Sequence, residues 1–89
     1  MRVIRSVKAT AEIEALRARG RERLADRVEM IVGRLEADPE GHRSVGMQVR
    51  TEDGGFGWAR SAEVAGDVCV VAWVVEDGDV VVFDVQHRF

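Results

Sequence analysis

The last residues of the chain bring together side chains that could cleave a phosphodiester bond. His87, Arg88 and Phe89 follow a valine-rich run from Val80 to Val85. A histidine can act as a general acid or base near neutral pH. An arginine can hold a phosphate through two hydrogen bonds, and an aromatic ring can stack on a base. The end of this run is therefore a candidate site.

Arginines on two earlier segments could complete such a site. Arg50 and Arg60 lie in two segments that alternate like strands. A base that activates a 2′-hydroxyl, together with arginines that stabilise the charged transition state, would suit metal-independent cleavage of RNA. The predicted catalytic residues are His87, Arg60 and Arg88. Arg50 and Phe89 are predicted to contact the substrate.

These residues also have ordinary structural interpretations. A histidine at the end of a strand is often a solvated or hydrogen-bonded surface residue. Arg50 and Arg60 could equally form ion pairs with acidic neighbours, and surface pairs of this kind are common and weak. The candidate partners are Glu52 and Glu63. Both interpretations stay open on the sequence alone.

The sequence predicts no metal site and no cofactor. Its two histidines and its one cysteine, Cys69, are widely spaced and match no zinc-binding pattern. The glycine-rich stretch at residues 54–57 lacks the lysine and the strand-to-helix context of a phosphate-binding loop. Cys69 lies in an apolar run, where a buried, unreactive thiol is expected. Trp58 and Trp73 are expected in the core, because an aromatic side chain buries a large area.

Length and composition indicate one soluble globular domain over residues 1–89. The chain is 46% hydrophobic and 33% charged, which is ordinary for this class. No apolar run approaches the ~20 residues that a membrane-spanning helix needs, and the N-terminus lacks the apolar stretch of a signal peptide. One cysteine cannot form an internal disulfide, so we expect a cytoplasmic protein.

The net charge of −3 is unevenly distributed. Residues 1–37 hold nine Arg and Lys against six Asp and Glu, whereas residues 38–89 hold four against ten. Nucleic-acid-binding proteins usually present a basic face. The acidic half of this chain would repel an RNA backbone unless its arginines cluster tightly.

Periodicity predicts the elements that must position the candidate site. Residues 2–7 are rich in β-branched side chains and predict a first strand. Thr10 is the expected N-cap of a first helix that ends or turns at Gly20. A second helix is predicted over residues 21–37, where Asp38-Pro39 ends it. Its apolar stripe recurs at helical spacing: Leu24, Val28, Ile31 and Leu35.

After Gly41 the apolar period changes to two, which predicts four strands. The expected segments are Val45–Arg50, Trp58–Glu63, Val68–Val75 and Val80–Val85, with turns at Glu52–Gly55, Gly66-Asp67 and Asp77-Gly78. The long apolar run from Val68 is expected at the sheet centre or covered on both faces. Strand alternation would place Val81, Phe83, Val85 and His87 on one face of the last strand. We expect an α+β fold, in which an N-terminal strand and a two-helix hairpin precede a four-stranded, mostly antiparallel sheet packed on the helices.

Three stretches carry a family resemblance. Leu35 to Pro39 is similar to an L-x-x-x-P helix end, and Trp58-Ala59-Arg60 is similar to a leucine–arginine strand. The third is similar to a G-D-Y-R-V-I-Y-like strand, an acidic turn, a valine-rich strand and a terminal H-R. Its matching positions are Gly66, Asp67, Val70, Val71, Asp77, Val80, Val82, Val85, His87 and Arg88. In this order and spacing the chain resembles the RelE/ParE superfamily of small bacterial toxins over nearly its whole length.

The resemblance implies a component of a type II toxin–antitoxin system. It implies a cognate antitoxin whose helix lies in a groove beside the sheet or the helical hairpin. It also implies, for ribonuclease members, messenger RNA on the ribosome as the target. The chain departs from those members at Val68 and Cys69, where they have tyrosine and arginine, and at Ala72, where they have a second tyrosine. It also ends at Phe89, before their C-terminal tyrosine segment.

Two hypotheses follow. The first is an endoribonuclease toxin that uses His87, Arg60 and Arg88 without a metal. The second is a non-catalytic member of the same fold that binds a protein, as gyrase-directed relatives do, or that is a regulatory or inert relative. In either case a homodimer or a bound partner would cover the exposed edge of a valine-rich sheet.

Overall fold

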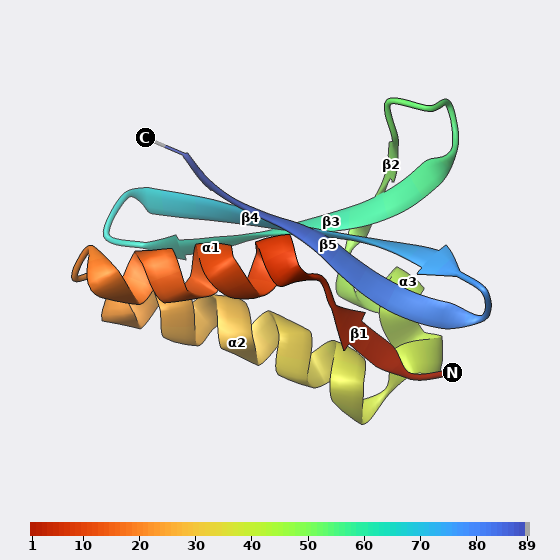
Figure 1. Cartoon of the computed structure of the whole chain (residues 1–89), viewed down its shortest axis with the longest axis horizontal. Coiled ribbons are helices and arrows are strands. Elements are labelled where there is room, and N and C mark those ends of the chain that lie inside the picture. The colour runs from red at the N-terminus through yellow and green to blue at the C-terminus, as the bar shows by residue number, and fades with distance from the viewer. Residues whose placement is uncertain (89) are drawn as a thin grey trace.

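The computed structural model describes residues 1–88, which form a helical hairpin packed on a β-sheet (Figure 1). The helices are α1 (Val7–Ala18), α2 (Glu22–Ala37) and the single turn α3 (His42–Val45), which follows a 3-10 turn, η1 (Pro39–Gly41). The strands are β1 (Val3–Arg5), β2 (Met47–Arg50), β3 (Phe56–Val64), β4 (Asp67–Glu76) and β5 (Asp79–Arg88). The predicted α+β order of a strand, two helices and four further strands is confirmed.

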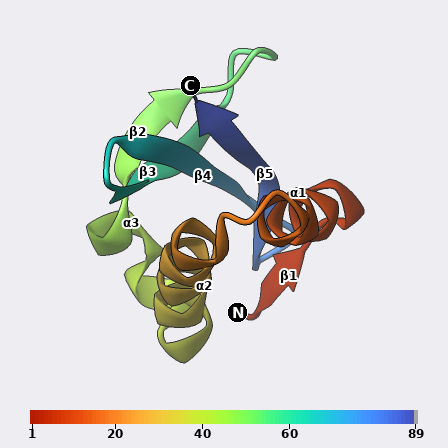
Figure 2. The same ribbon diagram turned by 90° about the vertical axis from the view of Figure 1, so that its left-hand side faces the viewer.

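All five strands join one mixed sheet in the order β1-β5-β4-β3-β2. The neighbours are antiparallel except β1, which runs parallel to β5 and adds a fifth strand to the expected four. The long apolar run is β4, which lies at the sheet centre, one of the two positions expected for it. Figure 2 shows α1 and α2 side by side under one face of the sheet. In the described chain the opposite face, called here the open face, carries no helix.

The core lies between the two long helices and the covered face of the sheet. The predicted stripe of α2 is confirmed, since Leu24, Val28, Ile31 and Leu35 are all at most 6% exposed. The sheet contributes apolar side chains at alternate positions: Trp58, Ala62, Cys69, Val71, Trp73, Val80, Val82 and Val85. Both tryptophans and the cysteine are therefore core residues, as expected. Burial raises the pKa of the Cys69 thiol to about 11, so it stays protonated near neutral pH.

The first helix begins earlier than its sequence predicts. Ser6 has an extended backbone, and its hydroxyl accepts a hydrogen bond from the N–H of Ala9 at 3.0 Å. Ser6 is thus the N-cap, and the prediction of Thr10 for this role was wrong. The cause is tertiary: the N–H of Ser6 donates to the carbonyl of Val82, which fixes the end of β1 against β5.

The loop between α2 and the sheet is also more helical than expected. Val45 lies in α3 rather than in a strand, and β2 starts at Met47. The side chain of Asp38 accepts a hydrogen bond from the N–H of Gly41 and so caps the 3-10 turn. Together η1 and α3 connect the end of α2 to β2, which lies at the edge of the sheet.

A β-bulge in β5 changes which residues share a face. Trp73 pairs with Val82 and Ala72 pairs with Asp84, so Phe83 is an extra residue on β5. Val80 and Val82 are therefore buried before the bulge and Val85 after it. The prediction that one face holds Val81, Phe83, Val85 and His87 was wrong, because strict alternation fails across a bulge.

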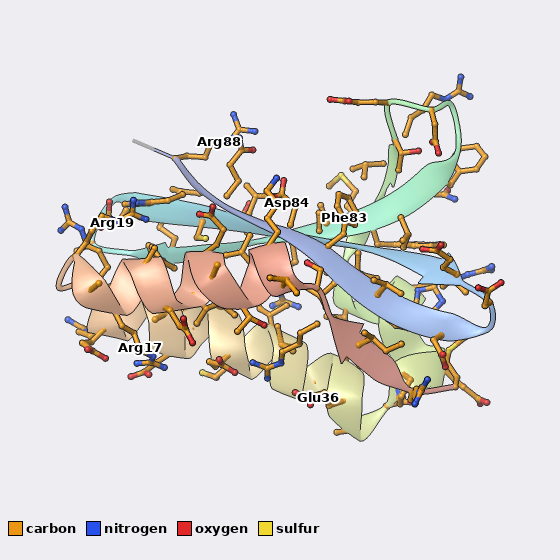
Figure 3. All side chains as sticks on the ribbon, in the orientation of Figure 1. Arg17, Arg19, Glu36, Phe83, Asp84 and Arg88 are labelled. Carbon is orange, nitrogen blue, oxygen red and sulfur yellow. The ribbon has the colours of Figure 1, made fainter. Side chains whose placement is uncertain are left out.

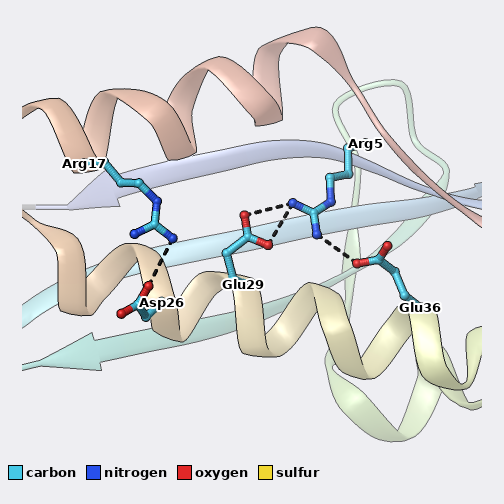
Figure 4. A network of polar contacts seen from close by, with 5 residues as sticks. All are labelled: Arg5, Arg17, Asp26, Glu29 and Glu36. Atoms are coloured by element: carbon cyan, nitrogen blue, oxygen red, sulfur yellow. Dashed lines mark hydrogen bonds and ion pairs between the residues drawn. The ribbon is translucent and has the colours of Figure 1, made fainter.

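Ion pairs tie β1 to α2 and α1 to α2 (Figure 4). Arg5 lies 2.8 Å from a carboxylate oxygen of Glu29 and 2.8 Å from one of Glu36. Arg17 reaches Asp26 at 3.0 Å in the same way. Because the side chain of Arg5 is only 31% exposed and holds two acids, it fixes the short β1 strand over α2.

Among the described residues, no helix is long and apolar enough to cross a membrane.

His42 is a buried histidine in α3. Its ring meets the ring of Trp58 edge-on at 4.5 Å between centroids, and its Nδ1 makes no hydrogen bond to any described residue. Burial, and then the neighbouring charge of Arg43, lower the pKa of His42. The folded protein therefore prefers the neutral ring.

We expect the protein to lose stability as the pH falls below about 6.5, the pKa of an exposed histidine. The unfolded chain takes up a proton on His42 there, whereas the folded chain does not until the pH reaches its lower pKa. Urea unfolding at about pH 7.5 and about pH 5.5 measures this loss on either side of that pKa. A His42→Phe variant, which keeps a ring against Trp58, should lose less stability over the same interval. An equal loss in the variant would contradict the assignment to His42.

Candidate functional site

His87, the predicted acid or base, lies near the end of β5 on the helix-covered face. It pairs with Cys69 in register, two residues beyond the buried Val85. Its Nε2 lies 3.1 Å from Oδ1 of Asp67, and only 4% of its side chain is exposed. Because a carboxylate can only accept, Nε2–H is the donor. The imidazole is therefore held inside the fold rather than presented at the surface.

Asp67 joins His87 to the helical hairpin. Its Oδ2 lies 3.2 Å from Nε of Arg21, which sits in the turn between α1 and α2. The three residues form one chain of contacts between the end of β5, the start of β4 and the helical turn. A carboxylate that orients an imidazole is also the arrangement of many general bases.

A small polar hollow lies beside His87. It has a volume of about 180 Å³, and Lys8, Glu12, Arg19 and Gln86 line it with His87. Pockets that take a small molecule measure roughly 300–1,000 Å³. The hollow beside His87 is therefore too small to admit a nucleotide without rearrangement.

The two predicted catalytic arginines lie on opposite faces of the sheet. Arg60 shares the covered face with Trp58 and Ala62, and its guanidinium donates to the carbonyl of Val45 at 3.0 Å. Arg88 pairs with Val68, one position along from His87, and its side chain points away from the helices (Figure 3). The sheet therefore separates Arg88 from both Arg60 and His87.

Of the two residues predicted to contact the substrate, Arg50 does not join the predicted catalytic residues. Arg50 lies at the far end of β2, where its guanidinium stacks 5.6 Å from the ring centroid of Phe56. Phe89 lies outside the described residues. Neither Arg50 nor Arg60 pairs with Glu52 or Glu63 in the part of the chain that the structure describes. The alternative in which Arg50 and Arg60 pair with Glu52 or Glu63 was therefore wrong.

Sequence reasoning missed Asp67 and Arg21. Asp67 was assigned to a turn, but the turn is Ala65-Gly66, both with positive φ, and Asp67 is the first residue of β4. The signal was present in the Asp77-Gly78 hairpin, where both residues also have positive φ as a type I′ turn requires. Counting outward from that turn places Asp67 beside the last residues of β5.

The open face of the sheet has an apolar end. Met47 and Val49 on β2 and Phe83 on β5 are 75%, 38% and 37% exposed. Two shallow hollows of about 450 and 460 Å³ lie there, one lined by Met47, Val49 and Val70 and the other by Phe56, Val74 and Phe83. Apolar side chains gathered on an open face are typical of a surface that another molecule covers.

No cluster of three or more His, Cys, Asp or Glu that could hold a metal ion occurs within residues 1–88. Comparison of the chain with family models, with curated proteins and with solved structures finds no match. The structure alone shows the α+β fold, and the candidate function rests on the residues of the site.

Proposed function

We propose that the chain is a toxin-like protein of the RelE/ParE type that acts by binding another protein. The observation that carries the proposal is the position of His87, which is bonded to Asp67 and 4% exposed at its side chain. Acid–base catalysis needs a histidine within reach of the substrate. Here the histidine is covered and the two predicted catalytic arginines lie on opposite faces of the sheet. The residues predicted to cleave a phosphodiester bond are therefore not brought together in one site.

The open face supports a binding role. Its apolar end, formed by Met47, Val49, Val70, Val74 and Phe83, is broad and shallow rather than deep. Protein interfaces commonly bury methionine and aromatic side chains in this kind of surface. The resemblance described above makes a cognate antitoxin the first candidate partner, and a second copy of the chain the next.

We expect induced expression of the wild-type chain to leave transcripts intact and co-expression with the product of a neighbouring short reading frame to give a stable complex. Met47→Asp should abolish the complex, because it places a charge within the apolar surface, at its most exposed side chain. Light scattering after size-exclusion chromatography measures the complex, and RNA length is read from the same cells. Val7→Asp is the matched control, since Val7 is 89% exposed at the start of α1 and away from the open face. A monomer with no partner would count against the proposal.

A second candidate is the metal-independent endoribonuclease, and the contact between His87 and Asp67 favours it. A carboxylate 3.1 Å from an imidazole would orient a general base once the end of β5 opened. Under this hypothesis wild-type protein shortens transcripts, whereas His87→Ala and Arg60→Ala do not. Intact RNA in all three cultures, at equal protein levels, would exclude it.

A further inference from the structure

The outer edge of β3 is unpaired over half of its length. β2 covers β3 only from Phe56 to Ala59, because β2 has four residues and β3 has nine. Residues 60–64 therefore have β4 on one side and no strand of the described chain on the other. In an antiparallel strand alternate residues direct their N–H and C=O groups to opposite sides. About half of the backbone groups in this segment thus face outward, as at any exposed edge.

Hollows flank this edge on both faces of the sheet. On the covered side a groove of about 140 Å³ runs between α2 and β3, lined by Arg27, Met30, Arg34 and Arg60. On the open side lies the hollow of about 450 Å³ lined by Met47 and Val70. Ser61 lines both of them. A strand added beside β3, in line with β2, would project its side chains alternately into these two spaces.

The covered-side groove is cationic. Arg27, Arg34 and Arg60 have no carboxylate within ion-pair distance among the residues that the structure describes. This contrasts with Arg5, Arg17 and Arg21, which each hold an acid. Met30, which is 57% exposed, adds an apolar contact between Arg27 and Arg34 on α2. The groove therefore presents positive charge from the arginines and an aliphatic surface from Met30.

We propose that this edge takes up an extended acidic segment of a partner protein as an additional strand. The segment would span about five residues, matched to residues 60–64, and would alternate acidic and apolar side chains. Its carboxylates would face Arg27, Arg34 and Arg60, and its apolar side chains would face Met47 and Val70. The inference deepens the proposed function by naming the chemistry of the partner, and it rests on the chain being a protein binder.

Peptide fits this groove better than RNA does. No aromatic ring lines the covered-side groove to stack on a base. Glu63 lines the groove together with the arginines, so the acidic side chains of the segment would have to face the arginines and not Glu63. The outward backbone groups of β3 are complementary to another peptide backbone and not to a sugar–phosphate chain. The edge and the charge thus point to the same class of ligand.

The test uses a fluorescent peptide of alternating Val and Glu, with binding measured by anisotropy on the full chain. The double variant Arg27→Glu/Arg34→Glu should weaken binding by at least about tenfold, since it reverses two charges that face the ligand. Arg23→Glu is the matched control and should bind like wild type, because Arg23 is an exposed arginine of α2 outside the groove. Equal weakening in both variants would show a general charge effect and overturn the proposal.

Two further peptides test the strand pairing itself. N-methylation at alternate residues on one edge of the peptide should abolish binding, and on the other edge should leave it unchanged, because only one edge pairs with β3. Binding that neither methylation changes, or that both abolish, would contradict the proposal, as would an oligonucleotide that binds as tightly as the peptide. A partner that still depends on Met47 while no acidic peptide binds would leave the proposed function standing and refute this inference alone.

Discussion

Replacing Trp73 with alanine should destabilise the protein by about 3–5 kcal/mol, the largest effect that we expect from one substitution. Trp73 is fully buried in β4, the central strand, and pairs with Trp58 on one side and Val82 on the other. Its removal leaves a cavity that the strands on both sides cannot close. Domains are stable by only about 5–15 kcal/mol, so this loss is a large share of the total and the variant should unfold at a markedly lower urea concentration than wild type. Urea unfolding followed by circular dichroism measures the difference.

A conservative change and an exposed aromatic residue control this experiment. Trp73→Phe should cost much less, because it keeps a ring and removes an indole N–H that has no hydrogen-bond partner among the described residues. Phe56→Ala should change stability little, since Phe56 is 57% exposed at the start of β3. If Phe56→Ala were as damaging as Trp73→Ala, the sheet rather than the buried ring would set stability.

Gly46→Ala should destabilise the protein by about 1–3 kcal/mol, through crowding alone. Gly46 has an extended backbone that any residue can adopt, with φ −133° and ψ 176°. A Cβ there would lie 2.4 Å from a ring carbon of Trp73 and 2.9 Å from the carbonyl oxygen of Ala59. The backbone oxygen cannot move aside as a flexible side chain could. Chemical denaturation measures the loss.

Gly33 provides the matched control for this change. It lies within α2, and a Cβ built on it meets nothing within 4 Å. Gly33→Ala should therefore stabilise the protein by up to about 1 kcal/mol, because alanine favours the helix more than glycine does. A gain at Gly33 with a loss at Gly46 separates crowding from conformational freedom.

A double-mutant cycle tests the cause of the loss at Gly46. In a Trp73→Phe background the ring that crowds the new Cβ is smaller, so Gly46→Ala should cost less than it does in wild type. Equal costs in the two backgrounds would assign the effect to the carbonyl of Ala59 instead.

The sequence predicted the elements better than it predicted their faces and ends. The spacing of Leu24, Val28, Ile31 and Leu35 indicates α2, and Asp77-Gly78 indicates the β4–β5 hairpin, because periodicity and turn chemistry are local properties. The true cap Ser6 was missed, since its position depends on a hydrogen bond from Ser6 to Val82, far along the chain. The bulge at Phe83 leaves no mark in a run of valines, and it alters the face of every residue before it.

The candidate site shows the same division. Residue types at the end of β5 pointed to acid–base and phosphate chemistry, and the roles predicted for His87, Arg60 and Arg88 stay predictions. Nothing in the sequence indicated that the guanidinium of Arg60 would donate to the carbonyl of Val45. Nor did it indicate that β3 would be longer than β2, which leaves residues 60–64 without a strand on that side. These features depend on where a short strand stops.

By itself, then, the sequence determined the order of the elements and the core stripe of α2, because each follows from apolar periodicity and turn residues that lie close together in the chain. Only the tertiary structure decided which charges meet. The basic first half and the acidic second half are joined by ion pairs from Lys8 to Asp84 and from Arg21 to Asp67. Asp67 in turn holds His87, the residue from which a catalytic role was first inferred. Such contacts arise from strand register and helix packing, which bring together residues that no local pattern connects.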